Sequence, residues 1–347
     1  MSLKYIKNYK IFIIGFIFCC IFAGYFFSGE KYVFEMNIGS KGSGLGQLLS
    51  PKGVVVDSKG NIYVLDQGNS RIQQFNNNGV YLSHFNSKQG DNGEFDQYYA
   101  IAIDKNDNIF LTLGYKTTEE YSTKSIFSTT YSTRYLKFTE YKIAKFNRMD
   151  VNPRQFGTNH GYEGLNSPYG IAINRNGDIY VTASSQWIQK FNTKGEYQLH
   201  FGGNEWFKNA FQLAIDSNEN IWIADYENNK IQKFNSNGEY QSKIWSIGSG
   251  DGQLDHPCGV AIDSKQNIFV ADTGNNRIQK FNSNGAYISQ FGSYGTDNGQ
   301  FHFPLTLTFD KNDNIFVVDL GNNRIQKFTK KNVLIIKIME LFKKLKL

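Results

Sequence analysis

The residues ADTGNNRIQKFNSNG, numbered 271–285, recur in nearly the same form at two other places in the chain. ADYENNKIQKFNSNG occupies 224–238 and VDLGNNRIQKFTKKN occupies 318–332, so consecutive copies start 47 residues apart. A fixed period of this length is the signature of a repeat architecture, in which each unit covers the apolar faces of its neighbours. The repeat therefore sets the fold class, and the rest of the chain can be aligned to it.

Short apolar runs, each ending in Asp or Asn, mark the first strand of every unit. Large and small side chains alternate in these runs with period two, which is typical of a β-strand. Each run is followed by an Asn- and Gly-rich turn, a second strand with Ile before an aromatic residue, a third strand of the RIQKF type and a tight turn into a fourth strand. Four antiparallel strands in each of six units predict an all-β, six-bladed β-propeller. The runs are GVVVD (53–57), AIAID (100–104), GIAIN (170–174), QLAID (212–216), GVAID (259–263) and TLTFD (306–310).

The sequence PCGVAID, followed by NIFVADTGNNRIQKF, resembles the NHL repeat. The resemblance is clearest at 51–75, 257–281 and 304–328, and it extends over about residues 34–330. It implies an NHL-type propeller domain over 31–330. NHL propellers include protein- and RNA-binding modules, and related propellers include lyases and hydrolases. The resemblance therefore implies a fold and leaves the function open.

A carboxylate and a basic residue flank the short loop between the second and third strands in four blades. We expect the carboxylate to accept loop N–H groups and to pair with the base, which would hold the loop closed. We interpret these residues as structural, because a catalytic carboxylate would not be repeated four times around a ring. The pairs are Asp66 with Arg71, Asp225 with Lys230, Asp272 with Arg277, and Asp319 with Arg324.

Residues 32–38 form a strand without a blade of their own. They precede the first repeat by the same distance as the fourth strand of blade five precedes the sixth repeat. We predict that they pair with the third strand of the last blade, 324–328, and so close the ring. The alternative is that 332–338 supplies this strand locally.

The N-terminal residues 1–30 contain an uncharged apolar run, 11–27, that follows three lysines. As a helix this run would span roughly 25 Å, close to the thickness of a hydrocarbon core. We expect an uncleaved membrane anchor; a cleaved signal peptide is the alternative, although no good cleavage site stands near Ala23 and Gly24. The preceding lysines favour a propeller exposed outside the cytoplasm.

The basic charge of the chain lies at its ends. The net charge is +6, of which residues 1–30 carry +2 and residues 330–347 carry +5, so the remainder carries −1. A nearly neutral body argues against nucleic-acid binding, which needs clustered Lys and Arg. The tail, 331–347, predicts a basic amphipathic helix suited to an anionic membrane surface or an apolar groove, or else a segment packed on the propeller edge.

All long variable connections fall on one face of the predicted propeller, which we call the top face. The largest is an insertion in blade two, 114–140, whose alternating β-forming residues predict a protruding β-hairpin. The residue before each first-strand run should line the mouth of the central channel on this face. These mouth residues are Lys52, Tyr99, Tyr169, Phe211, Cys258 and Leu305.

Aromatic residues at the mouth and in nearby loops predict a recognition surface for a protein or an extended ligand over blades two to four. Aromatic side chains give a large contact area with few rotors to freeze. The alternative is that the rings plug the channel or pack between blades. The predicted site residues are Tyr99, Tyr169, Phe211, Trp187, Trp206 and Phe207.

A metal-dependent lyase or hydrolase of the propeller class is the alternative function. Three histidines on the top face, His160, His256 and His302, could hold a metal across the channel. The sequence has no nucleophile elbow, P-loop, HExxH motif or Gly-rich dinucleotide turn. Only one cysteine, Cys258, lies in the body, so no cysteine-based zinc site is available there. The sequence therefore predicts a non-catalytic binding scaffold without a cofactor.

Overall fold

The computed structural model divides into two compact units, residues 34–328 and residues 1–33 together with 329–347. The predicted anchor 11–27, most of the predicted tail 331–347 and His160 lie outside the described residues. Within the part of the chain that is described, no helix is long and apolar enough to cross a membrane. The described residues are 30–86, 95–123, 131–146, 154–156, 165, 168–183, 187–203 and 205–332.

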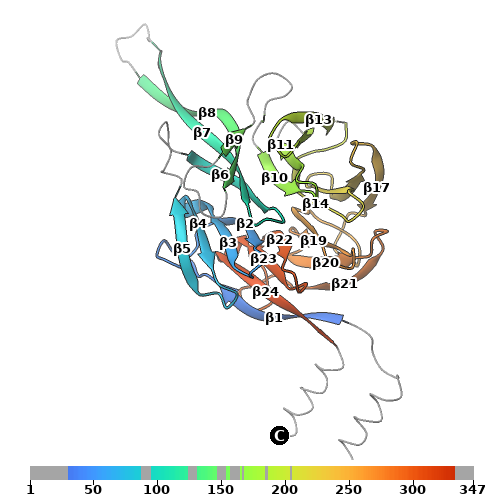
Figure 1. Ribbon diagram of the computed structural model, residues 1–347. Coiled ribbons are helices and arrows are strands. Elements are labelled where there is room, and N and C mark those ends of the chain that lie inside the picture. Colours follow the sequence, from blue (N-terminus) through green and yellow to red (C-terminus); the bar gives the residue numbers. More distant parts are fainter. Residues whose placement is uncertain are drawn as a thin grey trace, which may run out of the picture. The chain divides into compact units, whose positions relative to one another are not determined.

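Six four-stranded antiparallel sheets make up the larger unit, as the repeat predicted (Figure 1). Their innermost strands contact one another in a closed cycle: β2, β6, β10, β14, β18, β22 and back to β2. The prediction of an all-β, six-bladed propeller is therefore confirmed. Blade one consists of β2 (Pro51–Val56), β3 (Ile62–Asp66), β4 (Arg71–Phe75) and β5 (Tyr81–Asn86). Blade two consists of β6 (Phe95–Ile103), β7 (Ile109–Thr123), β8 (Tyr131–Phe146) and β9 (Arg154–Phe156). Blade three consists of β10 (Pro168–Ile173), β11 (Ile179–Ala183), β12 (Trp187–Phe191) and β13 (Tyr197–Gly202).

Blades four to six repeat this order, except that blade six takes its outermost strand from the start of the described chain. Blades four and five consist of β14 (Ala210–Ile215), β15 (Ile221–Asp225), β16 (Lys230–Phe234) and β17 (Tyr240–Trp245); and β18 (Gly259–Ile262), β19 (Ile268–Asp272), β20 (Arg277–Phe281) and β21 (Tyr287–Phe291). Blade six consists of β22 (Pro304–Phe309), β23 (Ile315–Asp319), β24 (Arg324–Asn332) and β1 (Glu30–Ile38).

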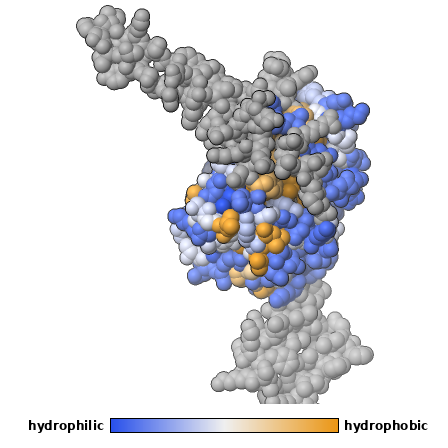
Figure 2. Space-filling view, turned by 60° about the vertical axis from the view of Figure 1, so that its left-hand side comes forward, coloured by the Kyte–Doolittle hydropathy of each residue, from blue (hydrophilic) through white to orange (hydrophobic). Residues whose placement is uncertain are grey.

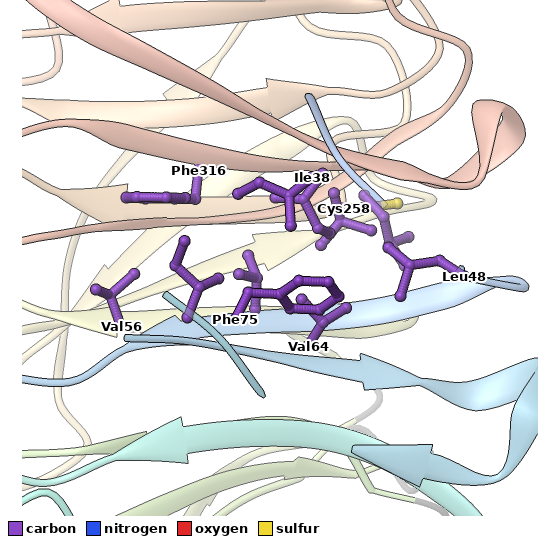
Figure 3. Close-up of a cluster of buried hydrophobic side chains, with 12 residues drawn as sticks. Ile38, Leu48, Val56, Val64, Phe75, Cys258 and Phe316 are labelled. Carbon is purple, nitrogen blue, oxygen red and sulfur yellow. The ribbon is translucent and has the colours of Figure 1, made fainter. Parts of the chain in front are cut away.

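The second strand of each blade is covered on both faces by the neighbouring blades. In β3, β11, β15, β19 and β23 every residue is buried. Figure 3 shows one such boundary, between blades six and one, where Phe316 and Ile38 face Val56 and Phe75. Burying each large apolar side chain contributes about 1.5–3 kcal/mol, so these boundaries are the main source of stability.

The ring closes through β1, which is the hydrogen-bonded neighbour of β24. This confirms the prediction that 32–38 supplies the missing strand. Phe34 packs edge-to-face on Phe328 with 6.0 Å between ring centroids, and Lys327 pairs with Glu35 at 3.3 Å. In the smaller unit, Lys330 pairs with Glu30 at 3.1 Å.

The blades are also joined on the face opposite the top face, where each first strand ends in a turn. Asp57 accepts hydrogen bonds from the backbone N–H groups of Lys59 and Asn61 at 2.9 and 2.8 Å, which fixes the turn. Asp107, in the equivalent turn of blade two, reaches back to the backbone N–H and hydroxyl of Ser58 at 2.8 and 2.7 Å. Asp313 makes the same two bonds to Ser264 and so links blade six to blade five, at 2.9 and 2.6 Å. Between blades four and five the side-chain oxygen of Gln266 accepts a hydrogen bond from the backbone N–H of Ser217 at 2.7 Å. These turns therefore connect neighbouring blades.

Blade two departs from the repeat on the top face. Its strands β7 and β8 stay paired from Ile109 with Phe146 out to Thr123 with Tyr131, over the region of the 114–140 insertion. Residues 124–130 lie outside the described part of the chain. The long pair projects from the ring in Figure 1.

Candidate functional site

Most mouth residues lie at a β-bulge in the innermost strand. A bulged residue leaves the regular pairing, and its side chain is aimed differently from those of its neighbours. In blade five, Cys258 instead lies just before β18, with its N–H donating to the carbonyl of Ala271 at 3.2 Å. The register shifts fall between Pro51 and Gly53, Tyr98 and Ala100, Pro168 and Gly170, Ala210 and Leu213, and Pro304 and Leu307.

Four rings from three blades form a continuous row at the mouth, which we call the aromatic row: Tyr169, Phe211, Tyr226 and His256. Tyr169 and Phe211 are stacked, with centroids 5.0 Å apart and ring planes 19° from parallel. Tyr226 lies 5.2 Å from Phe211 and 4.7 Å from His256. All four side chains are partly exposed. The row is therefore an ordered aromatic surface that a ligand can reach.

A hydrogen bond of Gln212, the residue that follows the mouth residue Phe211, spans the central channel. Gln212 of blade four donates its side-chain amide to the carbonyl of Leu307 in blade six at 3.2 Å, and its backbone N–H donates to the carbonyl of Cys258 at 3.1 Å. Blade five separates the two blades, so the first bond crosses the channel. The polar side chain of Gln212 therefore spans the channel next to the mouth.

Two ionisable groups share the mouth with the aromatic row. Burial raises the pKa of the Cys258 thiol to about 11, so this thiol is protonated at neutral pH. Burial also lowers the pKa of the Lys52 ammonium from its ordinary value of 10.5, an effect that the neighbouring Cys258 opposes. The carbonyl of Lys52 accepts a hydrogen bond from the Thr306 hydroxyl at 3.2 Å, which fixes its backbone.

The other predicted aromatic residues lie away from the row. Tyr99 is partly buried and packs on the core between blades two and three. Trp187 begins β12, a third strand, and lies 4.7 Å from the ring of His200. Trp206 is 39% exposed and packs on Tyr240 of the outermost strand of blade four, and Phe207 is fully buried. Of the six predicted residues, the structure thus brings Tyr169 and Phe211 together.

Sequence reasoning missed Tyr226, which joins Phe211 to His256. It follows Asp225 in the loop DYENN, where the equivalent loops have Gln67, Thr273 and Leu320. The one sequence signal for Tyr226 was its aromatic side chain, at a loop position where the residue type differs from blade to blade.

The four loop pairs stabilise the connections that lead into the blades. Asp272 is fully buried and accepts hydrogen bonds from Arg277 at 2.7 Å, from Asn275 and Gln279 at 2.9 Å and from the N–H of Asp255 at 2.7 Å. The guanidinium of Arg277 also donates hydrogen bonds to backbone carbonyls of the loop that precedes blade five. Asp66 with Arg71 and Asp319 with Arg324 are also 2.7 Å apart, and Asp225 with Lys230 are 3.5 Å apart.

The described top-face histidines have different neighbours. His256 pairs through Nδ1 with Asp255 at 2.6 Å, beside Tyr226. His302 stacks on Phe303 at 4.8 Å and lies 5.4 Å from Tyr294. Among the residues for which coordinates are described, no group of three or more His, Cys, Asp or Glu could hold a metal ion.

A cavity of about 300 Å³ lies at the opposite end of the channel. Carboxylates that line it, such as those of Asp216 and Asp263, already accept hydrogen bonds within their own turns. Elsewhere, on the face shown in Figure 2, apolar residues form small groups among hydrophilic ones. The mouth combines contiguous rings with a partly buried charge, that of Lys52.

Comparison with known proteins agrees with the repeated blades of the structure. Four segments, 48–75, 212–234, 254–281 and 301–328, match the NHL repeat model. They fall on blades one, four, five and six. No curated protein matches the sequence.

Solved structures with the same fold are distant in sequence. A virginiamycin B lyase from Staphylococcus aureus is 15% identical, with 88% of each chain covered and a TM-score of 0.54. A protein of unknown function from Bacteroides thetaiotaomicron is 13% identical, covering 87% of this chain and 77% of its own, with a TM-score of 0.64. A gluconolactonase from Xanthomonas campestris is 11% identical, covering 87% of this chain and 100% of its own, with a TM-score of 0.59. These likenesses concern the fold alone. The four repeat matches and the six closed blades show that the chain is a six-bladed β-propeller that contains NHL repeats.

Proposed function

We propose that this propeller is a non-catalytic binding module, and that a protein segment or other extended ligand binds over the aromatic row. The observation that carries this proposal is the contiguity of Tyr169, Phe211, Tyr226 and His256, with ring centroids 4.7–5.2 Å apart. A pre-stacked row costs little conformational entropy when a ligand covers it, because the rings are already ordered.

The surroundings of the row support a binding role. The bond between Gln212 and Leu307 closes the channel below it, so a ligand lies across the mouth. The carboxylates of the loops between the second and third strands are engaged, since Asp225 and Asp272 are fully buried and hydrogen-bonded within their own blades. These contacts favour a rigid platform over a set of reactive groups.

We also propose that residues 11–27 anchor the chain in a membrane and display the propeller outside the cytoplasm. The uncharged run and its flanking lysines support this topology. The basic tail, 331–347, would add contacts to an anionic membrane surface. Protease added to intact cells should then digest the propeller and spare the N-terminal flank.

Photo-crosslinking tests the binding surface directly. A photoreactive phenylalanine analogue placed at Phe211 should capture a partner in intact cells, whereas the same analogue at Trp245 should not. Trp245 is a suitable control because it is 56% exposed and lies on the outermost strand of blade four. Replacing Tyr169, Phe211 and Tyr226 of the row together by Ala should abolish capture of that partner by other top-face probes. Unchanged binding by a folded triple variant would reject the proposal.

A metal-dependent lyase or hydrolase remains the competing proposal, because the similar structures include a virginiamycin B lyase and a gluconolactonase. It would rest on His256 and His302, with His160 as a third ligand. Elemental analysis of the purified chain distinguishes the two. Stoichiometric metal that is lost in a His256→Ala, His302→Ala double variant would favour the enzyme.

A further inference from the structure

Lys52 has an unusual position for a lysine of this protein. It occupies the bulge at the start of β2, and it supplies the charged member of the six mouth residues. The described residues provide no ion pair or hydrogen bond to its ammonium group. In contrast, the partly buried ammonium groups of Lys190, Lys230 and Lys327 lie 3.1–3.5 Å from the carboxylates of Asp178, Asp225 and Glu35.

The carboxylates closest to the row are occupied by other groups. Asp255 pairs with His256 at 2.6 Å, and Glu227 accepts a hydrogen bond from the side-chain amide of Asn209. Burial raises the pKa of the Tyr226 hydroxyl, and Asp255 and Glu227 add to this effect. A partly desolvated cation to which the described residues offer no counter-ion is unfavourable, and an incoming anion would remove that cost.

The charge and the rings share one neighbour at the mouth. Cys258 links them, since it interacts electrostatically with Lys52 on one side and belongs to the core cluster on which Phe211 and Tyr226 pack on the other. Leu305, another mouth residue, belongs to the same cluster. Among the described mouth residues, Lys52 therefore presents one positive charge beside apolar and aromatic side chains.

We infer that the ligand of the mouth carries one carboxylate next to a flat apolar group, with the carboxylate paired to the ammonium of Lys52 and the apolar group against Phe211. This inference rests on the binding function proposed above and adds the chemistry of the ligand. A lone lysine provides a point charge that suits a single carboxylate, whereas phosphate recognition more often uses an arginine fork or several donors. The carboxylate can belong to a free aromatic acid or to the C-terminus of a peptide that ends in an aromatic residue.

The test uses the full-length chain in a non-ionic detergent and four organic probes. Two are acids, phenylacetate and acetyl-Gly-Gly-Phe, and two are the corresponding neutral amides; inorganic phosphate is the fifth probe. Ligand-observed NMR titration gives each Kd. We expect at least one acid to bind about 10- to 100-fold more tightly than its amide, as for a hydrogen bond to a charged group. The acid that binds more tightly distinguishes a free acid from a peptide terminus.

Matched variants assign the preference to Lys52. Lys52→Met should remove the preference for the acid, and Lys52→Arg should retain it. Lys59→Met should leave it unchanged, because Lys59 is an exposed lysine in the turn at the opposite face. The Lys52→Arg variant and a thermal melt of each protein separate loss of the charge from loss of the fold.

Several results would overturn the inference. These are equal binding of acid and amide, an acid preference that survives in Lys52→Met, inorganic phosphate binding as tightly as the acids, or no binding of any probe. Failure of the proposed function is distinguishable from these results. Crosslinking at Phe211 decides that question without any assumption about charge, and it can succeed when the acid preference is absent.

Discussion

Gln212 and Leu307 are hydrogen-bonded to each other across the central channel, although a whole blade separates the strands that carry them. The bond lets blade four contact blade six directly. It also places a polar side chain next to the mouth. The side chain of Gln212 therefore connects two blades that are not neighbours in the ring.

Replacing this side chain should loosen the ring slightly. Gln212→Ala removes a net contribution of about 1 kcal/mol for the cross-channel bond and leaves the carbonyl of Leu307 without that donor. Urea unfolding should show a correspondingly lower midpoint. Gln241→Ala, on an exposed strand, is the control and should change the midpoint little. Equal midpoints for the two variants would show that the cross-channel bond carries no net stability.

Closure through β1 predicts a large effect at Ile38. This side chain is fully buried at the boundary between blades six and one, so Ile38→Ala should lower the free energy of unfolding by about 2–5 kcal/mol. Ile288→Ala, at a site that is 47% exposed, should change it by less than about 0.5 kcal/mol. Chemical denaturation measures both values, and similar losses would argue against closure through β1.

Removing the carboxylate of a loop pair should cost more unfolding free energy where the basic partner is more deeply buried. Asp272→Ala leaves Arg277 uncompensated, with only 8% of its side chain exposed, so a loss of about 3–5 kcal/mol is expected. Asp225→Ala should cost less, because Lys230 is 17% exposed and already 3.5 Å from its partner. Thermal unfolding of the two variants compares them, and a larger loss for Asp225→Ala would contradict this account.

Burial of Lys52 and Cys258 predicts opposite pH dependences. Because the folded-state pKa of Lys52 is lowered, its ammonium destabilises the fold at lower pH, and stability is regained as pH rises from that pKa towards 10.5. Because the pKa of Cys258 is raised from 9.0 to about 11, its protonated thiol stabilises the fold below pH 9, and this contribution is lost as pH rises towards 11.

The comparison of wild type with Lys52→Met isolates the first effect. The variant should be more stable than wild type at pH 7, and the difference should shrink by pH 10, as measured by urea midpoints. Cys258 is present in both proteins and therefore contributes little to the difference. A difference in urea midpoint that stays constant from pH 7 to pH 10 would show that the charged form of Lys52 does not destabilise the fold.

The repeat predicted the fold because period-two alternation reports which side chains face inwards, and because six aligned runs specify six sheets. The same alignment identified the mouth residues, including Phe211. It could not show that Phe211 stacks on Tyr169 or that Tyr226 extends the row, since loop side chains are oriented by neighbouring blades. Phe207 illustrates the opposite case: an aromatic residue in a loop satisfied the sequence criterion, yet tertiary packing buries it completely.

Pairing of β1 with β24 also has a consequence for biosynthesis. The first of these strands leaves the ribosome almost three hundred residues before its partner. Until the partner is made, the nascent propeller is an open ring of blades, and the apolar faces at its open boundary are exposed to solvent. Blade six cannot be completed until β24 has been synthesised. Premature termination before β24 would therefore leave five formed sheets and a permanently unsealed edge, which is a direct route to aggregation and to recognition by quality control.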